Sequence, residues 1–240
     1  MTATTTPGFD GVAPAYDLMV GLSPGYHAQL RASARAFVES LPRRSAPLLL
    51  LDLGCGSGAS TRALVTELDA AGLTYRLVGI DASAGMLAQA QRSTWRDVTF
   101  EHARAEDVPA LLAERGWTPD GIFAAYLLRN VTERDAMLGG LAAHLAPGAP
   151  VLVHDYSVAG DPLARAAWTL LCWCIIVPLS VVLTRRPGLF VYLWRSVLDF
   201  DSTETVMQRF LRAGLTDVRT RRVPGWQGSM VHMVHGKAAA

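Results

Sequence analysis

A glycine-rich loop that begins with a carboxylate is the part of the sequence whose residue types and spacing point most directly to ligand chemistry. The segment 52–58 reads DLGCGSG, follows an unbroken apolar run and precedes a helical pattern. Gly54, Gly56 and Gly58 let the backbone turn sharply and approach a ligand closely, which suits a nucleotide-like cofactor at a helix N-terminus. With Ala59, the first two glycines also satisfy the dinucleotide fingerprint GxGxxG/A, so spacing alone does not identify the cofactor.

The charge of Asp52 separates the two cofactors that fit this spacing. A dinucleotide would place a doubly anionic pyrophosphate at the loop, where the carboxylate would repel it. S-adenosylmethionine (SAM) instead carries an ammonium and a sulfonium cation, and a carboxylate can hold the ammonium by a charge-assisted hydrogen bond. We therefore expect SAM as the cofactor and keep NAD-linked oxidoreduction as a weaker alternative. A turn whose glycines serve geometry alone is the structural alternative.

Side chains after the second and third expected strands could hold an adenosine. Asp81 ends the run VGID, where a carboxylate can accept both ribose hydroxyls, a role that SAM and NAD share. Met86 could pack on the adenine face, and Glu106 or Asp107 could reach the adenine amino group. An N-cap for the following helix explains these two acids equally well.

These residues lie at element ends in a pattern that alternates strands with helices. Short apolar or alternating runs predict strands at 48–53, 75–80, 98–101, 121–126 and 151–155, and two more at 217–223 and 229–235. Helical spacing predicts helices at 26–41, 60–71, 84–92, 108–115, 133–145 and 203–211. We therefore expect an α/β fold with a doubly wound, mostly parallel seven-stranded sheet, whose ligands bind beyond the carboxyl ends of the strands.

Composition and cysteine usage argue against several classes of partner. The chain has 240 residues, 22 Lys+Arg against 21 Asp+Glu and a formal net charge of +1, so we expect no nucleic-acid partner. Cys55, Cys172 and Cys174 have no metal-ligand spacing, and we expect no metal. An odd cysteine count and a start without a secretory pattern predict reduced thiols in a cytoplasmic protein.

Several motifs together resemble a known superfamily. The loop DLGCGSG, the acidic end of the second strand and LAPG at 145–148 resemble class I SAM-dependent methyltransferases over about residues 48–156. The stretch LRNVTERD at 128–135 looks more narrowly like the ubiquinone and menaquinone C-methyltransferases, as do segments 16–19, 192–200 and 228–237. The resemblance implies a Rossmann-like methyltransferase fold with SAM as cofactor.

The resemblance also implies a reaction and roles for particular residues. That family methylates a ring carbon of a polyprenylated benzo- or naphthohydroquinone, so carbon methylation of a lipophilic phenol is implied here. Arg129 and Asn130 would lie over the substrate ring, with Arg129 helping to deprotonate a ring hydroxyl through a bound water. A guanidinium stays charged and would stabilise the phenolate. Asp155 and Tyr16 are further catalytic candidates, and a surface Arg129 beside a helix-capping Asn130 is the structural alternative.

An apolar stretch after the fifth expected strand needs its own explanation. Segment 166–184 contains no charged residue and is near the length of a bilayer span, with Arg185 and Arg186 at its end and Pro178 in its middle. We interpret 166–200 as a helical lid over a lipophilic pocket, with peripheral membrane contact. A true span and a homodimer interface stay open. The expected organisation is a flexible tail, 1–15, and one domain, 16–240.

The function that these features predict is SAM-dependent methylation of a hydrophobic small molecule. Carbon methylation of a quinol, phenol or prenylated compound is the leading prediction. The chain departs from the quinone family at 149–150 and 154–157, so O- or N-methylation of a hydrophobic secondary metabolite is the alternative. A non-catalytic SAM-binding or membrane-associated module and a SAM-assisted cyclisation are weaker alternatives.

Overall fold

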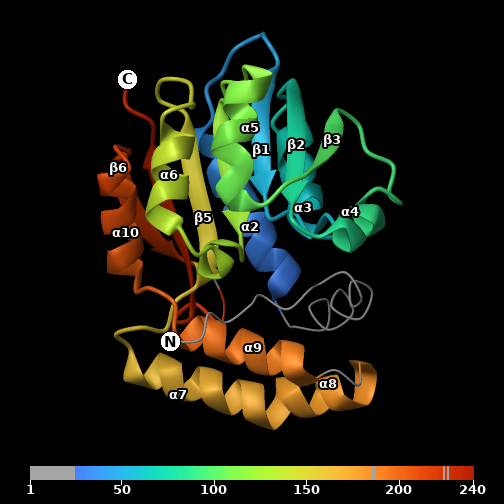
Figure 1. Ribbon diagram of the computed structural model, residues 1–240, viewed down its shortest axis with the longest axis vertical. Helices are drawn as coiled ribbons and strands as arrows, with labels where there is room; N and C mark the ends of the chain where they lie inside the picture. The colour runs from blue at the N-terminus through green and yellow to red at the C-terminus, as the bar shows by residue number, and fades with distance from the viewer. Residues whose placement is uncertain (1–24, 185–186, 224, 226) are drawn as a thin grey trace.

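A sheet of seven strands runs through the molecule (Figure 1). The computed structural model describes residues 25–184, 187–223, 225 and 227–240. The strands lie in the order β3-β2-β1-β4-β5-β7-β6, in which β1 to β5 are parallel and β7 is antiparallel to both of its neighbours. The prediction of a doubly wound, mostly parallel seven-stranded α/β fold is confirmed.

The elements follow the predicted order with shifts of a few residues at their ends. The strands are Leu48–Leu53 (β1), Tyr75–Asp81 (β2), Val98–His102 (β3), Gly121–Ala125 (β4), Pro150–Tyr156 (β5), Thr216–Arg222 (β6) and Val231–Lys237 (β7). The helices against the sheet are Tyr26–Ser40 (α2), Ala59–Ala70 (α3), Ala84–Ala90 (α4), Val108–Arg115 (α5), Arg134–Ala142 (α6) and Thr203–Arg212 (α10). The helix predicted at 133–145 therefore ends at Ala142, and the last strand lies two residues further along the chain than predicted.

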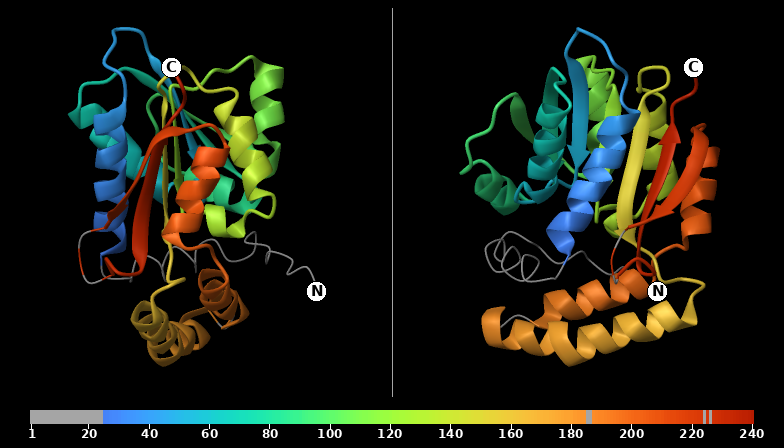
Figure 2. Two further views of the ribbon diagram at one scale, coloured as in Figure 1. Left: turned by 90° about the vertical axis from the view of Figure 1, so that its left-hand side faces the viewer. Right: turned by 180° about the vertical axis from the view of Figure 1, so that it is seen from behind.

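Helices cover both faces of the sheet. Helices α2 and α3 pack together on one face, while α5, α6 and α10 lie on the other, as the front and back views show (Figures 1 and 2). Successive side chains of a strand point to opposite faces, so each strand contributes to both layers. In β1, Leu51 and Leu53 face the core under α5 and α6, whereas Leu48 and Leu50 face the core under α2 and α3.

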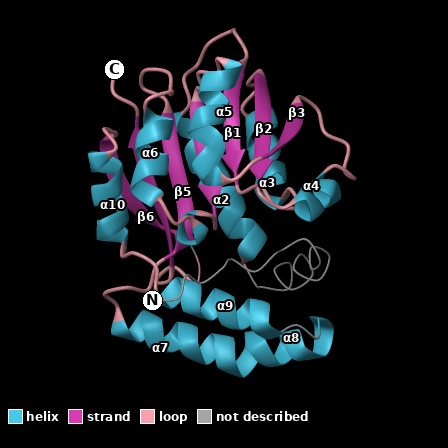
Figure 3. Ribbon diagram, viewed as in Figure 1, coloured by secondary structure: helices cyan, strands magenta, loops and turns pink. Residues whose placement is uncertain are grey.

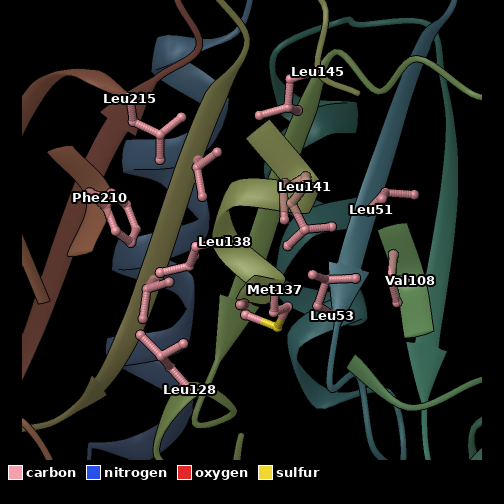
Figure 4. Close-up of a cluster of buried hydrophobic side chains, with 14 of the residues drawn as sticks. Leu51, Leu53, Val108, Leu128, Met137, Leu138, Leu141, Leu145, Phe210 and Leu215 are labelled. Atoms are coloured by element: carbon pink, nitrogen blue, oxygen red, sulfur yellow. The ribbon is translucent and has the colours of Figure 1, made fainter. Parts of the chain in front are cut away.

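The larger core lies between the sheet and the α5, α6 and α10 layer (Figure 4). Its side chains come from elements far apart in the sequence, including Val108, Leu138 and Phe210, all of which are almost fully buried. Burying one such side chain contributes roughly 1.5–3 kcal/mol of stability. This core fixes the relative positions of the strands and thereby of the side chains at their carboxyl ends.

A helical hairpin lies beyond the carboxyl ends of the parallel strands (Figure 3). It consists of Pro162–Leu171 (α7), a π-helical turn at Cys172–Ile176, Val177–Thr184 (α8) and Pro187–Leu198 (α9), which runs back beside the others. The Asp161 side chain caps α7 by accepting hydrogen bonds from the backbone N–H groups of Leu163 and Ala164, each at 3.0 Å. The hairpin is the segment interpreted from the sequence as a lid.

Pro178 does not interrupt this hairpin in the way that the sequence suggests. It is the second residue of α8, directly after the π-helical turn. A proline is tolerated in the first turn of a helix, and a π-helical turn relieves the crowding and lost hydrogen bond that it would otherwise cause. Among the described helices, Pro162–Val181 is long and apolar enough to cross a membrane, although 28 % of its most apolar window is buried inside the molecule.

Candidate active site

The glycine loop adopts backbone conformations that side chains disfavour. Gly54, Gly56 and Gly58 have φ values of 70°, 53° and 95° between β1 and α3. A Cβ on Gly54 would meet Leu127 at 3.0 Å, and one on Gly58 would meet the Trp95 ring at 2.9 Å. A Cβ on Gly56 would meet no atom of the described residues within 4 Å, apart from its own chain neighbours. The loop is therefore pressed against neighbouring side chains at its two ends and open at its centre, where a ligand can approach the backbone.

Asp52 lies fully buried at the end of β1, beneath the first turn of α3. Its Oδ2 accepts hydrogen bonds from Ser60 Oγ at 2.8 Å and Thr61 Oγ1 at 2.7 Å. Its Oδ1 is buried and has no hydrogen-bond partner among the described residues. Burial raises the pKa of Asp52 to about 7 despite these two hydrogen bonds. One oxygen thus holds the first turn of α3, and the other is a buried acceptor whose hydrogen-bonding capacity the described residues leave unused.

Asp81 ties the end of β2 to the glycine loop. One carboxylate oxygen accepts a hydrogen bond from the Gly56 backbone N–H at 2.8 Å, and the other accepts one from Ser83 N–H at 2.8 Å. Ser83 in turn caps α4 by accepting from the Met86 backbone N–H at 3.2 Å. The Met86 side chain is buried. The structure therefore brings Asp81 and Met86 to the same edge of the sheet as Asp52.

The two acids after β3 differ in their surroundings. Glu106 Oε1 accepts a hydrogen bond from the Thr132 backbone N–H at 3.2 Å and lies 3.6 Å from Arg104 Nη2. Asp107 is exposed and occupies the N-cap position of α5, where its side chain makes no capping hydrogen bond. Glu106 thus connects the β3 end to the loop after β4, whereas the contribution of Asp107 to the site stays a prediction.

A buried ion pair joins the ends of β4 and β5. Arg129 Nη1 lies 2.6 Å from Asp155 Oδ1, and both side chains are almost fully buried. Asp155 also accepts hydrogen bonds from the backbone N–H groups of Arg129, at 3.3 Å, and Tyr156, at 2.9 Å. These contacts fix the orientation of the guanidinium, so the surface-arginine alternative is wrong. The carboxylate is engaged in holding Arg129, and the predicted catalytic role of Asp155 stays a prediction.

An aromatic cluster that the sequence analysis does not predict surrounds this ion pair. The Tyr126 ring stacks on Tyr26 at 5.4 Å between ring centres and lies 5.2 Å from Tyr156. Tyr156 continues the cluster to Trp168 of α7 at 4.8 Å. The Arg129 guanidinium carbon lies 5.7 Å from the Tyr126 ring centre and 5.9 Å from that of Tyr156. Tyr26, Tyr126 and Tyr156 share a place at or next to the end of a helix or strand, which is the one sequence signal that could have indicated them.

The Tyr126 hydroxyl is the least satisfied polar group of the cluster. It is buried and has no hydrogen-bond partner among the described residues. Burial raises the pKa of Tyr126 well above its usual value, so the hydroxyl keeps its proton and can act as a donor. Tyr126 also has a φ of 56°, a left-handed conformation that is uncommon for a residue with a side chain. Such strain is often found where a side chain is aimed at a ligand.

His154 precedes Asp155 in β5 and therefore faces the opposite side of the sheet. Its Nδ1 forms a hydrogen bond with Ser33 Oγ at 2.5 Å, and Ser33 Oγ also lies 3.1 Å from the Gln29 carbonyl oxygen. Burial, with a smaller effect of Arg129, lowers the pKa of His154 to about 3. The imidazole is therefore neutral near pH 7 and is too weak a base for proton abstraction.

Asn130 links the site to the helical hairpin. Its Oδ1 accepts a hydrogen bond from the Tyr192 hydroxyl of α9 at 3.2 Å, and its Nδ2 donates to the Tyr126 carbonyl at 3.3 Å. The same carbonyl accepts from Arg129 Nη1 at 2.7 Å. Asn130 is therefore held between strand β4 and the hairpin. The remaining catalytic candidate, Tyr16, lies outside the described residues.

The residues at this sheet edge fit SAM. The orphaned Asp52 Oδ1 matches an ammonium group, the open centre of the glycine loop admits a ligand, and Asp81 stands where a ribose is held in doubly wound folds. Leu127, whose side chain occupies the space next to Gly54, lies two residues after the end of β4 and two residues before Arg129. The cofactor loop and the aromatic cluster are therefore adjacent.

Comparisons with known proteins agree with this geometry. Residues 4–233 match the ubiE/COQ5 methyltransferase family. The chain is 28 % identical over 224 residues to the demethylmenaquinone methyltransferase of Mycolicibacterium vanbaalenii, covering 90 % of this chain and 88 % of the relative. It is 29 % identical over 221 residues to the ubiquinone/menaquinone biosynthesis C-methyltransferase UbiE of Shewanella frigidimarina, and this match covers 88 % of this chain and 82 % of the relative. Phosphoethanolamine N-methyltransferase 2 of Haemonchus contortus, solved with SAM, has the same fold with a TM-score of 0.63 and 15 % sequence identity. The match covers 96 % of this chain and 57 % of that chain.

Proposed function

Because the chain belongs to the ubiE/COQ5 methyltransferase family, and is thus a SAM-dependent methyltransferase, we propose that it methylates a ring carbon of a lipophilic, quinol-like phenol. The observation that carries this proposal is the buried Arg129–Asp155 pair beside an aromatic cluster. A cation held in an apolar, aromatic environment suits an acceptor that is flat, hydrophobic and able to become anionic.

Arg129 and Tyr126 would act on the oxygen of the acceptor. The charged guanidinium lowers the energy of a phenolate, and the proton of the ring hydroxyl leaves to a water beside it. The Tyr126 hydroxyl, which keeps its proton, can donate a hydrogen bond to the same oxygen. Charge on that oxygen increases electron density at the ortho carbon, which would bond to the methyl group as the bond between that methyl group and the cofactor sulfur breaks. The proton on the methylated carbon would then leave to water, and the ring would regain its aromaticity. Asp155 contributes by keeping Arg129 in one orientation.

The cofactor-binding residues would be those that meet at the ends of β1, β2 and β3. When bound, SAM supplies an electrophilic methyl group. Asp52 would hold its ammonium, the glycines its methionine portion, Asp81 the ribose, and Met86 with Glu106 or Asp107 the adenine. The aromatic cluster would exclude water from the reacting atoms, so positioning and desolvation would provide most of the rate acceleration.

A labelling experiment tests this proposal. The full chain is incubated with methyl-labelled SAM and a panel of reduced demethylnaphthoquinones with short prenyl tails, simple phenols, indoles and hydrophobic amines. Mass spectrometry of the products locates the label on ring carbon, oxygen or nitrogen. Label on a quinol ring carbon is the expected result. Label on oxygen or nitrogen alone would replace carbon methylation with the alternative reaction, and an unlabelled panel would overturn the choice of acceptor.

An arginine variant tests the role of the ion pair. Arg129→Lys retains the charge beside Asp155 but loses the planar fork, so we expect kcat to fall by about 100-fold with little change in SAM affinity. Arg44→Lys is the matched control, because Arg44 also pairs with a buried aspartate, Asp120, at the amino-terminal end of β4. Equal turnover of Arg129→Lys and the wild type would contradict the proposed mechanism.

A further inference from the structure

Exposed large apolar side chains are concentrated on one rod of the helical hairpin, which consists of α7, the π-helical turn and α8 (residues 162–184). Six large hydrophobic side chains are prominently exposed in the part of the chain that the structure describes, and five of them belong to α7, the π-helical turn and α8. These five are Leu163, Leu170, Trp173, Ile175 and Val181. Leu163 and Leu170 are seven residues apart, which places them on the same side of α7. The concentration on one rod separates these residues from ordinary scattered surface hydrophobics.

The opposite side of α7 and of the π-helical turn is buried against the rest of the molecule. Ala164, Trp168 and Cys172, spaced four residues apart, are buried against α9 and the aromatic cluster. The Trp168 indole N–H also donates to the Trp194 carbonyl of α9 at 3.3 Å. In Figure 1, α7 and α8 are the elements farthest from the sheet, with α9 between them and the strands. Leu163 and Leu170 lie on the side of α7 away from these buried residues, and with the exposed Ile175 and Val181 they form what we call the outer face of the hairpin. Trp173 is half-exposed at the edge of this face, because its ring also packs edge-on against Trp194 of α9 at 5.5 Å between ring centres.

The charge of the hairpin is one-sided, although that of the whole chain is not. Between Asp161 and Asp199 the sequence contains four arginines, at 165, 185, 186 and 195, and no acidic residue. The whole chain has a net charge of only +1. Arg165 and Arg195 are exposed, and Arg165 Nη1 donates to the Leu198 carbonyl at 3.4 Å, which places it on the flank of the hairpin. An apolar face with cationic flanks is complementary to an anionic, hydrophobic boundary.

We propose that the outer face of the hairpin docks on an anionic phospholipid bilayer, with α7 and α8 lying along its surface. Leu163, Leu170 and Ile175 would enter the headgroup and acyl boundary, and Trp173 would lie at the interface that indole rings favour. The exposed Arg165 and Arg195 would contact lipid phosphates. A spanning orientation is incompatible with this fold, because it would pull Trp168 away from Tyr156 and α9.

A second copy of the chain fits the outer face less well. An interface between two copies would bring two arginine-bearing hairpins together without any acidic residue in either to compensate. Docking on a bilayer would also bring the site close to its acceptor, a step that rests on the proposed function. An acceptor with a lipid tail would pass from the membrane to the site through the hairpin that covers it. The inner side of the same rod contacts Tyr156 of the candidate active site.

Vesicle flotation tests the proposal without cofactor or acceptor. The full chain is mixed with phosphatidylcholine vesicles containing one-quarter phosphatidylglycerol, or with pure phosphatidylcholine vesicles. Wild-type protein should float with the anionic vesicles, and Leu163→Glu/Leu170→Glu should bind them at least about tenfold more weakly. Leu211→Glu is the matched control, because Leu211 is the sixth exposed hydrophobic residue and lies on α10, so its binding should equal that of the wild type. Arg165→Ser/Arg195→Ser should lose about fivefold per arginine on anionic vesicles only.

Other outcomes overturn the proposal in distinguishable ways. Absence of wild-type flotation, or equal flotation of the Leu163→Glu/Leu170→Glu variant with unchanged thermal unfolding, would show that the outer face does not dock on lipid. If the wild type fails to float and is a dimer that this variant converts to monomers, the outer face is an interface between copies. Methylation of a water-soluble phenol without vesicles is measured in parallel. If the wild type does not methylate the phenol, the proposed function is contradicted, whereas the vesicle-binding result is unaffected.

Discussion

Asp52 combines a structural and a binding role in one side chain, and its two oxygens divide them. Oδ2 holds Ser60 and Thr61, whereas Oδ1 has no partner among the described residues. Because burial raises its pKa to about 7, the carboxyl group of the free protein is half protonated near neutral pH. A cationic ligand requires the ionised form, so binding of the cofactor is coupled to loss of a proton.

The first prediction concerns this coupling. SAM affinity, measured by calorimetry, should be about tenfold weaker at pH 6 than at pH 8, because protonation of Asp52 competes with the ligand ammonium below its pKa. Asp52→Asn should bind weakly at both pH values. Asp120→Asn is the control, since Asp120 is a buried aspartate at the opposite end of the sheet. A wild-type affinity that does not change between pH 6 and 8 would refute the assignment.

Tyr126 carries the second prediction. Tyr126→Phe removes a buried hydroxyl without a described partner, so the free energy of unfolding should stay the same or rise by as much as about 1 kcal/mol. If the hydroxyl donates to the acceptor oxygen, kcat should nevertheless fall by about 10- to 100-fold. Tyr75→Phe should do the reverse, costing about 1 kcal/mol of stability with kcat unchanged, because the Tyr75 hydroxyl donates to Asp69. Undiminished turnover in Tyr126→Phe would rule out the donor role.

At the scale of elements, one hydrogen bond joins the hairpin to the loop after β4. The Tyr192 hydroxyl of α9 donates to Asn130, which is itself held against the end of β4. A second contact joins Trp168 of α7 to Tyr156 at the end of β5, at 4.8 Å between ring centres. The hairpin and the candidate catalytic residues are therefore connected at two places.

The third prediction tests the Tyr192 connection. Tyr192→Phe should raise KM for the acceptor by a few-fold and leave kcat within about twofold, because it loosens the cover without touching Arg129; the stability cost should be about 1 kcal/mol or less. Ser196→Ala removes a hydrogen bond within α9 only, to the Leu193 carbonyl, and should change neither constant. A matching rise in KM for both variants would show that α9 responds to general loosening.

The limits of sequence reasoning also become clear at this scale. The parallel strands were predictable because each is a short apolar run, and the glycine loop because its residue types are unusual. The Arg129–Asp155 pair was partly accessible, since both residues follow or end neighbouring strands, whose carboxyl ends meet. Tyr126 was not, because nothing local distinguishes a strand-ending tyrosine from an active one. The π-helical turn that accommodates Pro178 likewise has no local sequence signal.

At the scale of the whole molecule, buried titratable groups have opposite effects on how the free energy of unfolding changes with pH. His154 and His235 have pKa values lowered by burial to about 3 and about 4, so the unfolded chain binds their protons first as the pH falls below 6.5. Their contribution to stability is present above pH 6.5 and is lost as the pH falls from there toward 4. Asp52 has the opposite effect, because its raised pKa means that the folded state takes up the proton first between pH 7 and 3.8.

The fourth prediction follows from this opposition. The wild-type free energy of unfolding should decrease between pH 6.5 and 4, because two histidines outweigh one aspartate. Asp52→Asn lacks the opposing group, so its stability should decrease more steeply, by up to about 1.4 kcal/mol more for each pH unit. Denaturant unfolding at several pH values measures both slopes. Parallel slopes for the two proteins would contradict the raised pKa of Asp52.

The three cysteines differ in a way that makes the molecule convenient for optical work. Burial raises the pKa of the Cys172 thiol to about 12 and that of Cys55 well above its usual value, whereas Cys174 is exposed between Trp173 and Ile175. A thiol-reactive dye should therefore label Cys174 alone in the native protein. The emission wavelength of an environment-sensitive fluorophore attached there would report whether the surroundings of the hairpin are aqueous or apolar.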